Sequence, residues 1–210
     1  MRLEGIRSSS FYTPAKHLGF GVAAGVLFAL CFPPYHRPIF LPLAVALLLC
    51  GLHGISPMQG AMVGLVCGMF YFGGTLFWLT NLFGAGAISL CLMLALFIAL
   101  FSALTVWLRD KFPTIPLWVI APVLWTAVEW YRAEAFVLSF GWMGLGYALV
   151  NAPWLAFFAS IVGVYGLSFG MVVLGVLLTE ALERSALIKP LFFSCWVWGM
   201  LLSLPRSLPT

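Results

Sequence analysis

The residues best suited to chemistry lie in one stretch, from Glu129 to Tyr147. Glu129, Arg132 and Glu134 fall within six residues of one another, although the chain is 63% hydrophobic and only 8% charged. Glu129 and Arg132 are three residues apart and therefore share a face of a helix. A charge at a membrane boundary is costly unless it is paired or hydrated. The stretch is therefore either an interfacial ion pair that caps a helix, or a charged lip on a groove for a lipid headgroup or a partner domain.

Three other patterns are interpreted as structural. Gly166-Leu-Ser-Phe-Gly170 matches the nucleophile elbow of hydrolases, but that motif works on a sharp turn from strand to helix. This run is expected to lie mid-way along an apolar helix, where its serine would bond to its own backbone. The three histidines have no second histidine or carboxylate three or four residues later, and the five cysteines lie in apolar runs without C-x-x-C spacing. We therefore predict no metal site and no cofactor.

The composition predicts an integral membrane protein. Mean hydropathy is +1.10, and no Asp, Glu, Lys or Arg occurs between Ile39 and Leu108. A soluble domain carries about a quarter of its residues as charged ones. The long apolar runs favour helices over the alternating pattern of a barrel. The fold class is therefore all-α, a polytopic helical membrane bundle of about seven transmembrane helices. The net charge of +4 comes from short loops and does not indicate nucleic-acid binding.

The apolar runs predict the order of the spans. They cover residues 18–34, 38–56, 58–80, 86–108, 115–131, 154–179 and 188–204. The segment 135–150 has only sixteen apolar residues, so it is either half-inserted or an eighth crossing. With seven spans and a cytoplasmic N-terminus, seven Lys and Arg residues lie on the cytoplasmic side and three on the outer side. If 135–150 also crosses, six lie on the cytoplasmic side and four on the outer side. The positive-inside rule thus favours seven spans. We divide the chain into a cytoplasmic segment (1–17), a transmembrane domain (18–204) with a periplasmic-side loop at 132–153, and a tail (205–210).

Glycines recur every four residues in the third run. Gly60, Gly64 and Gly68 therefore share one helix face, which lets another backbone approach closely. We expect this face to pack against another helix of the same chain. The alternative is that it forms the interface of a dimer.

Several short patterns together resemble a known family. Trp125-x-x-x-Glu129-x-x-Arg132, followed by Phe140-x-Trp142 and Leu145-Gly146-Tyr147, resembles the membrane domain of apolipoprotein N-acyltransferases. Further pieces agree in order: Ala29-Leu-Cys-Phe-Pro-Pro-Tyr35, Gly68-x-x-x-Phe72-x-x-Gly-x-x-Trp78 and Gly163-x-x-Gly166-x-Ser168-Phe169. The resemblance runs from about residue 19 to 204. The chain departs from the family pattern at Ala133, Gly141 and Leu149, where the family usually has Gly, Pro and Gln.

The resemblance implies a bacterial inner-membrane protein that acts in the N-acylation of lipoproteins. Enzymes of this family carry a nitrilase-like domain after the seventh span, and the cysteine of its Glu-Lys-Cys triad takes an acyl chain from a phospholipid. That domain would begin near residue 205, so we assign no catalytic residue here. The resemblance implies a lip that receives phospholipid or docks the catalytic domain, formed by Glu129, Arg132, Trp142, Gly146 and Tyr147.

The expected partners are membrane phospholipid, an apolipoprotein substrate, and a nitrilase-like domain or separate subunit. The alternatives are one subunit of a split acyltransferase, and a membrane scaffold or lipid-binding protein without chemistry. A transporter is a weaker third, because we find neither inverted repeats nor charges at mid-membrane.

Overall fold

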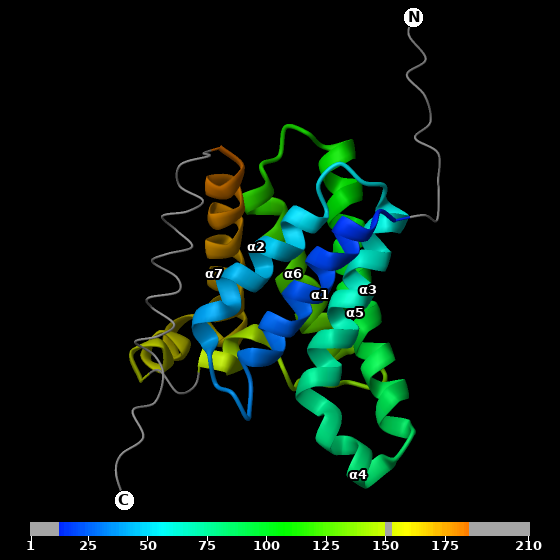
Figure 1. The fold of residues 1–210 in the computed structure, drawn as a ribbon. Helices are drawn as coiled ribbons and strands as arrows, with labels where there is room; N and C mark the ends of the chain where they lie inside the picture. The colour runs from blue at the N-terminus through cyan, green and yellow to red at the C-terminus, as the bar shows by residue number, and fades with distance from the viewer. Residues whose placement is uncertain (1–12, 150–152, 185–210) are drawn as a thin grey trace, which may run out of the picture.

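The computed structural model describes residues 13–149 and 153–184, and within these residues its regular elements are helical, without a strand. The helices form the predicted all-α membrane bundle (Figure 1). In this part of the chain, three helices are long and apolar enough to cross a membrane: Pro57–Phe83, Gly86–Lys111 and Phe157–Glu183. Shorter apolar helices accompany them, so the total of seven spans stays a prediction.

The α-helices are, in order along the chain, α1 (Ala15–Leu30), α2 (Leu41–Gly51), α3 (Pro57–Leu76), α4 (Thr80–Phe83), α5 (Gly86–Lys111), α6 (Leu117–Trp130) and α7 (Pro153–Arg184). Apart from the short α4 at the turn between α3 and α5, the α-helices alternate in direction along the chain (Figure 1). Short helices stand between them: η1 (Pro38–Phe40), η2 (Phe77–Leu79), η3 (Tyr131–Ala135) and η4 (Leu145–Leu149). The α1–α2 turn and the α6–α7 connection lie at the same end of the bundle, which we call the loop end.

Local sequence explains where several helices begin. Ser56 caps α3: its hydroxyl accepts from the Gln59 backbone N–H at 3.4 Å, while the Gln59 side chain accepts from the Ser56 N–H at 3.0 Å. Pro57 follows at the first helical position, where its missing N–H costs nothing. Pro116 likewise precedes α6 in an extended conformation.

The glycine face of α3 packs against α5 inside the molecule. A Cβ on Gly68 would lie 2.6 Å from the Ala95 Cα, and one on Gly64 would lie 2.5 Å from the Ile98 carbonyl oxygen. Atoms cannot approach that closely, so glycine is required for the two backbones to pack at this distance. The predicted packing within the bundle is confirmed for this face.

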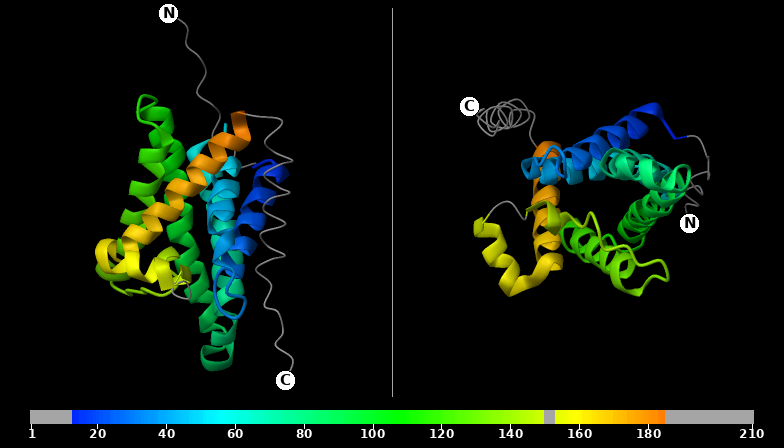
Figure 2. Two further views of the ribbon diagram at one scale, coloured as in Figure 1. Left: turned by 90° about the vertical axis from the view of Figure 1, so that its left-hand side faces the viewer. Right: turned by 90° about the horizontal axis from the view of Figure 1, so that it is seen from below.

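The span limits differ from the sequence prediction at several points. α1 begins at Ala15 and ends at Leu30, because the chain turns at the Pro33-Pro34 pair instead of continuing to residue 34. The predicted sixth span was a continuous helix over 154–179, but α7 is interrupted at Gly163, with φ 70° and ψ 176°. Its two segments meet at an angle in Figure 2. The predicted span 188–204, the tail 205–210 and most of the segment 1–17 lie outside the described residues.

The segment after α6 does not cross the bundle. It consists of the π-helical turn η3, further turns, and the 3₁₀ helix η4. α6 ends and α7 begins at the same end (Figure 1). Residues 135–149 therefore form a loop in the structure, while the number of crossings and the periplasmic location of the loop stay predictions.

Candidate functional site

The last turn of α6 carries a buried carboxylate. Glu129 is 6% exposed, and Trp125 lies one helical turn before it on the same face. The Trp125 indole Nε1–H donates to Glu129 Oε2 at 2.8 Å. The two side chains therefore form one rigid unit within α6.

Two further elements bind the same carboxylate. The Ser168 hydroxyl, from α7, donates to Glu129 Oε1 at 2.8 Å. The backbone N–H of Leu145, at the start of η4, donates to Glu129 Oε2 at 3.4 Å. The N–H of Gly146 in turn donates to Ser168 Oγ at 2.9 Å. We call these five residues, Trp125, Glu129, Leu145, Gly146 and Ser168, the Glu129 cluster.

The break in α7 determines where Ser168 lies. Because the helix restarts after Gly163, the run Gly166–Gly170 stands near the start of the second segment of α7. The expectation that Ser168 bonds to its own backbone is wrong, since its single proton is donated to Glu129. A helical segment precedes the motif, so the strand-to-helix turn of a nucleophile elbow is not present at this place.

Arg132 is buried but does not pair with Glu129. It is 4% exposed, and the structure records no direct ion pair between the two residues in the described part of the chain. Its guanidinium carbon lies 5.5 Å from the centre of the Phe72 ring, and its Nη1 has no hydrogen-bond partner among the described residues. The interfacial ion pair, one of the two interpretations of the sequence, is therefore absent, and both side chains are buried within the bundle.

Glu134, the third charge of the stretch, lies at the surface. Its Oε1 accepts from the hydroxyl of Tyr165 at 2.9 Å, and this exposed contact joins η3 to α7. Glu134 is therefore part of the connection between two elements and takes no part in the Glu129 cluster.

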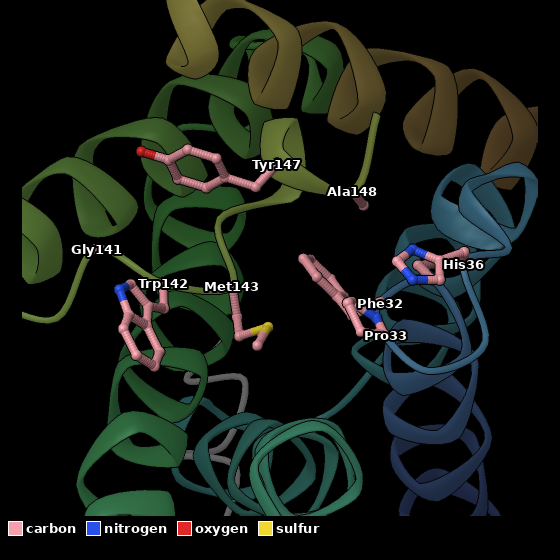
Figure 3. Close-up of a pocket in the computed structure, with 9 residues that line it drawn as sticks. Phe32, Pro33, His36, Gly141, Trp142, Met143, Tyr147 and Ala148 are labelled. Atoms are coloured by element: carbon pink, nitrogen blue, oxygen red, sulfur yellow. The ribbon is translucent and has the colours of Figure 1, made fainter. Parts of the chain in front are cut away.

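A cavity of about 560 Å³ opens beside the Glu129 cluster at the loop end (Figure 3). One wall comes from the turn after α1 and the other from the loop before and within η4. Phe32 and Met143 face each other across it in Figure 3. Its lining is Cys31, Phe32, Pro33, His36, Gly141, Trp142, Met143, Tyr147 and Ala148. A cavity of this size with so apolar a lining can hold an acyl chain or another apolar group.

Backbone strain is concentrated in the two walls of this cavity. Among the described residues, only His36 (φ 52°) and Met143 (φ 60°) have positive φ without being glycine. Such conformations cost roughly 1–3 kcal/mol and persist where the surroundings hold them, often at functional sites. The Tyr71 hydroxyl holds Met143 by donating to its carbonyl oxygen at 2.6 Å.

The five predicted lip residues thus divide into two groups. Glu129, Arg132 and Gly146 are buried, whereas Trp142 and Tyr147 are 56% and 51% exposed and line the cavity. Sequence reasoning missed Ser168, Tyr71 and Met143 as members of this site. The signal for Ser168 was present in the G-x-S-x-G run, and only the expectation of an unbroken helix concealed it.

The histidines lie in three different environments. His17 is buried in α1, with its Nδ1 2.9 Å from the Gly51 carbonyl oxygen. His36 lines the cavity. His53 Nδ1 lies 3.5 Å from Glu183 Oε1, which joins the turn after α2 to the end of α7. That partner is far away in sequence, so local spacing could not predict it.

Comparison with known proteins now assigns the family. The family description "Apolipoprotein N-acyltransferase N-terminal domain" matches residues 24–177. The chain belongs to this family. The match includes α6, the loop to α7, and the whole Glu129 cluster. The resemblance drawn from the short sequence patterns is therefore confirmed.

Three relatives carry the name apolipoprotein N-acyltransferase. The protein of Geobacter metallireducens is 32% identical over 188 residues, which cover 84% of this chain and 36% of the relative. The protein of Photobacterium profundum is 28% identical over 204 residues, which cover 90% of this chain and 39% of the relative. The protein of Nitrosomonas europaea is 34% identical over 157 residues, which cover 70% of this chain and 31% of the relative. The chain thus spans between 31% and 39% of the length of these relatives.

Proposed function

We propose that this chain is the membrane domain of a protein that N-acylates lipoproteins, with a membrane phospholipid as the acyl donor. Family membership supports the reaction class. The observation that carries the choice of site is the cavity of about 560 Å³ at the loop end, lined almost entirely by apolar side chains. On this proposal the cavity receives an acyl chain of the donor.

The lining suits a molecule that is apolar at one end and polar at the other. Phe32, Pro33 and Met143 offer apolar walls, while Trp142 and Tyr147 are about half exposed. Tyr and Trp have an apolar body and a polar tip, and they favour the membrane interface for that reason. An acyl chain would pack against the walls, and the headgroup would lie outside near the aromatic rim.

The proposal assigns the bond-forming chemistry to a nitrilase-like unit outside the described residues, either a domain or a separate subunit. A thiol nucleophile needs a neighbouring base that activates it. Cys31, Cys67 and Cys91 are buried among apolar side chains, which suits packing and not nucleophilic attack. The loop end would then face the periplasm and contact that unit, with the N-terminus in the cytoplasm of a bacterial inner-membrane protein.

The test is acyl transfer by the full-length natural protein in nanodiscs. The donor is dioleoyl phosphatidylethanolamine, the acceptor is a diacylglyceryl lipopeptide, and the N-acylated product is measured by mass spectrometry. We expect Trp142→Ala to raise the KM for the phospholipid about tenfold, as the loss of one aromatic contact of about 1.4 kcal/mol would do. Trp118, which is 51% exposed at the start of α6, gives the matched control Trp118→Ala with no change in KM.

The two alternatives give different results in this assay. An unchanged KM for Trp142→Ala would contradict the cavity as the donor site. No product from the natural protein, even after addition of any nitrilase-like protein that crosslinks to it, would favour a membrane scaffold or lipid-binding protein. Product only in the presence of such a partner would indicate a split acyltransferase.

A further inference from the structure

We infer that Ser168 is a positioning residue that holds the loop of residues 140–149 against the buried Glu129 carboxylate and thereby sets the wall of the cavity. The consequence for phospholipid rests on the proposed function, whereas the positioning of the loop does not. The inference gives a role to the Gly166–Gly170 run, which the proposed reaction does not use.

Ser168 stands between a side chain and a backbone amide. Its hydroxyl donates to Glu129 Oε1 and accepts from the Gly146 N–H, at 2.8 Å and 2.9 Å. The residue is fully buried, so water cannot replace either bond. A serine hydroxyl has one proton to donate, and here both its direction and its acceptor are determined. Ser168 therefore links α6, α7 and η4 through one atom.

The loop lies directly on this group of residues. A Cβ at Gly144 would lie 2.5 Å from Glu129 Oε1, and a Cβ at Gly146 would overlap the Val164 carbonyl oxygen. Only glycine lets the backbone approach the carboxylate and α7 so closely. Val164 directly follows the helix break at Gly163, so Gly146 packs against the backbone next to this break.

The held residues are neighbours of the cavity wall. Leu145 and Gly146, whose amides bind the cluster, stand between Met143 and Tyr147, which both line the cavity. Met143 has positive φ and needs its surroundings to keep that conformation. Release of Leu145 and Gly146 would therefore allow Met143 and Tyr147 to move, and the cavity would change shape.

The first experiment measures hydrogen exchange in the full-length natural protein in nanodiscs. Ser168→Ala removes the acceptor of the Gly146 N–H and one of the donors to the Glu129 carboxylate, which itself binds the Leu145 N–H. We expect peptides that cover 140–149 to exchange about tenfold to hundredfold faster, as the loss of a hydrogen bond to a charged group does. Peptides from α3 and α5 should keep their protection.

The chain offers a matched control. Ser102, on α5, is as fully buried as Ser168, yet its Oγ has no hydrogen-bond partner among the described residues. Ser102→Ala removes the same atom from an equally buried place and should leave exchange at 140–149 unchanged. Ser168→Thr keeps a hydroxyl and should restore most of the protection.

Two results would overturn the inference. If Ser168→Ala leaves hydrogen exchange at 140–149 unchanged, the serine does not hold the loop. If Ser168→Ala also lowers the exchange protection of α3 and α5, the serine supports the whole fold and not the loop alone. A double variant with Glu129→Gln sharpens the test: if both residues act on the same loop amides, its effect on exchange is smaller than the product of the single effects.

Kinetics then separate the inference from the proposed function. With dioleoyl phosphatidylethanolamine as donor, Ser168→Ala should raise KM about tenfold and leave kcat within about twofold, because the altered wall weakens binding and not the chemistry. Faster exchange at 140–149 with an unchanged KM supports the positioning role and contradicts the cavity as the donor site. Slower turnover with unchanged exchange contradicts the positioning role.

Discussion

Helices α3 and α5 pack closely because glycines on α3 carry no side chain, whereas α6, α7 and the loop between them are joined by hydrogen bonds of polar groups. In the first contact, Gly64 and Gly68 leave the space that Ile98 and Ala95 occupy. In the second, Glu129 accepts three hydrogen bonds from three elements. Both regions are buried and closely packed, but they depend on different groups. The first cannot accept an added atom, whereas the second also cannot lose a polar one.

The difference has a physical reason in the membrane. Lipid tails are as apolar as the helix surfaces, so helices associate through close contact, which small residues permit. A loop cannot be held in that way, because its backbone N–H groups need acceptors once they are buried. A carboxylate provides several acceptor sites in a small volume. The Glu129 cluster is therefore suited to hold an irregular segment at the end of a bundle.

The largest effect is expected for Glu129→Ala. It leaves the Trp125 indole, the Leu145 amide and the Ser168 hydroxyl without their acceptor. Each buried donor that loses its acceptor costs about 1–3 kcal/mol of unfolding free energy. Thermal unfolding in detergent should show this loss of stability. Glu134→Ala, at the surface, should cost less than about 1 kcal/mol, and equal losses for the two variants would contradict the comparison.

The next largest effect tests the glycine contact. In Gly68→Ala the new methyl would meet the Ala95 Cα at 2.6 Å, and backbone cannot move aside cheaply. We expect a loss of about 1–3 kcal/mol of unfolding free energy. Gly73 lies on the same helix, and no atom lies within 4 Å of the position that a Cβ would take there. Gly73→Ala should therefore leave stability unchanged or slightly raised, and a similar loss for both variants would mean that close packing is not the cause.

A smaller effect is expected where a single neutral hydrogen bond holds the loop. Tyr71→Phe removes the bond of 2.6 Å from the Tyr71 hydroxyl to the Met143 carbonyl oxygen and leaves the ring packing intact. The expected loss is about 1 kcal/mol. Hydrogen exchange should rise at 140–149 and remain unchanged in α5. If exchange rises in α5 but not in the loop, Tyr71 acts through packing alone.

The smallest effect is expected for the second buried serine. Ser102 lies against Gly64, and its Oγ has no hydrogen-bond partner among the described residues. Ser102→Ala should leave the unfolding free energy unchanged or raise it by up to about 1 kcal/mol, because no bond is lost with the buried hydroxyl. If Ser102→Ala lowers the unfolding free energy as much as Ser168→Ala does, burial and not hydrogen bonding decides the role of these serines.

Much of the fold could be predicted from the sequence, because long apolar runs without charge suit only a helical membrane bundle. The glycine face of α3 was also predictable, since four-residue spacing places Gly60, Gly64 and Gly68 on one side of any helix. The break at Gly163 was not, because the residues around it are as apolar as those of an uninterrupted helix. A single positive φ at a glycine leaves no mark on hydropathy.

The candidate site could be predicted in part. The sequence determined that charges and aromatic residues gather between Glu129 and Tyr147, and a short-range rule then paired Glu129 with Arg132. That rule holds on a continuous α-helix. Glu129 and Arg132 do face the same side, since both line one small internal cavity with Tyr71 and Phe72, but their side chains form no direct ion pair within the described residues.

Only the tertiary structure decided which groups bind the carboxylate. Its partners in the loop and in α7 lie 16 and 39 residues further along the chain. No periodicity of a single helix relates residues so far apart, since their meeting depends on how α6 and α7 pack. The sequence by itself determined the apolar bundle and the polar stretch at its end, because hydropathy and local spacing act along the chain. The packing of α6 and α7 determined that this stretch holds a loop against a cavity, because buried polar groups must find partners wherever the fold brings them.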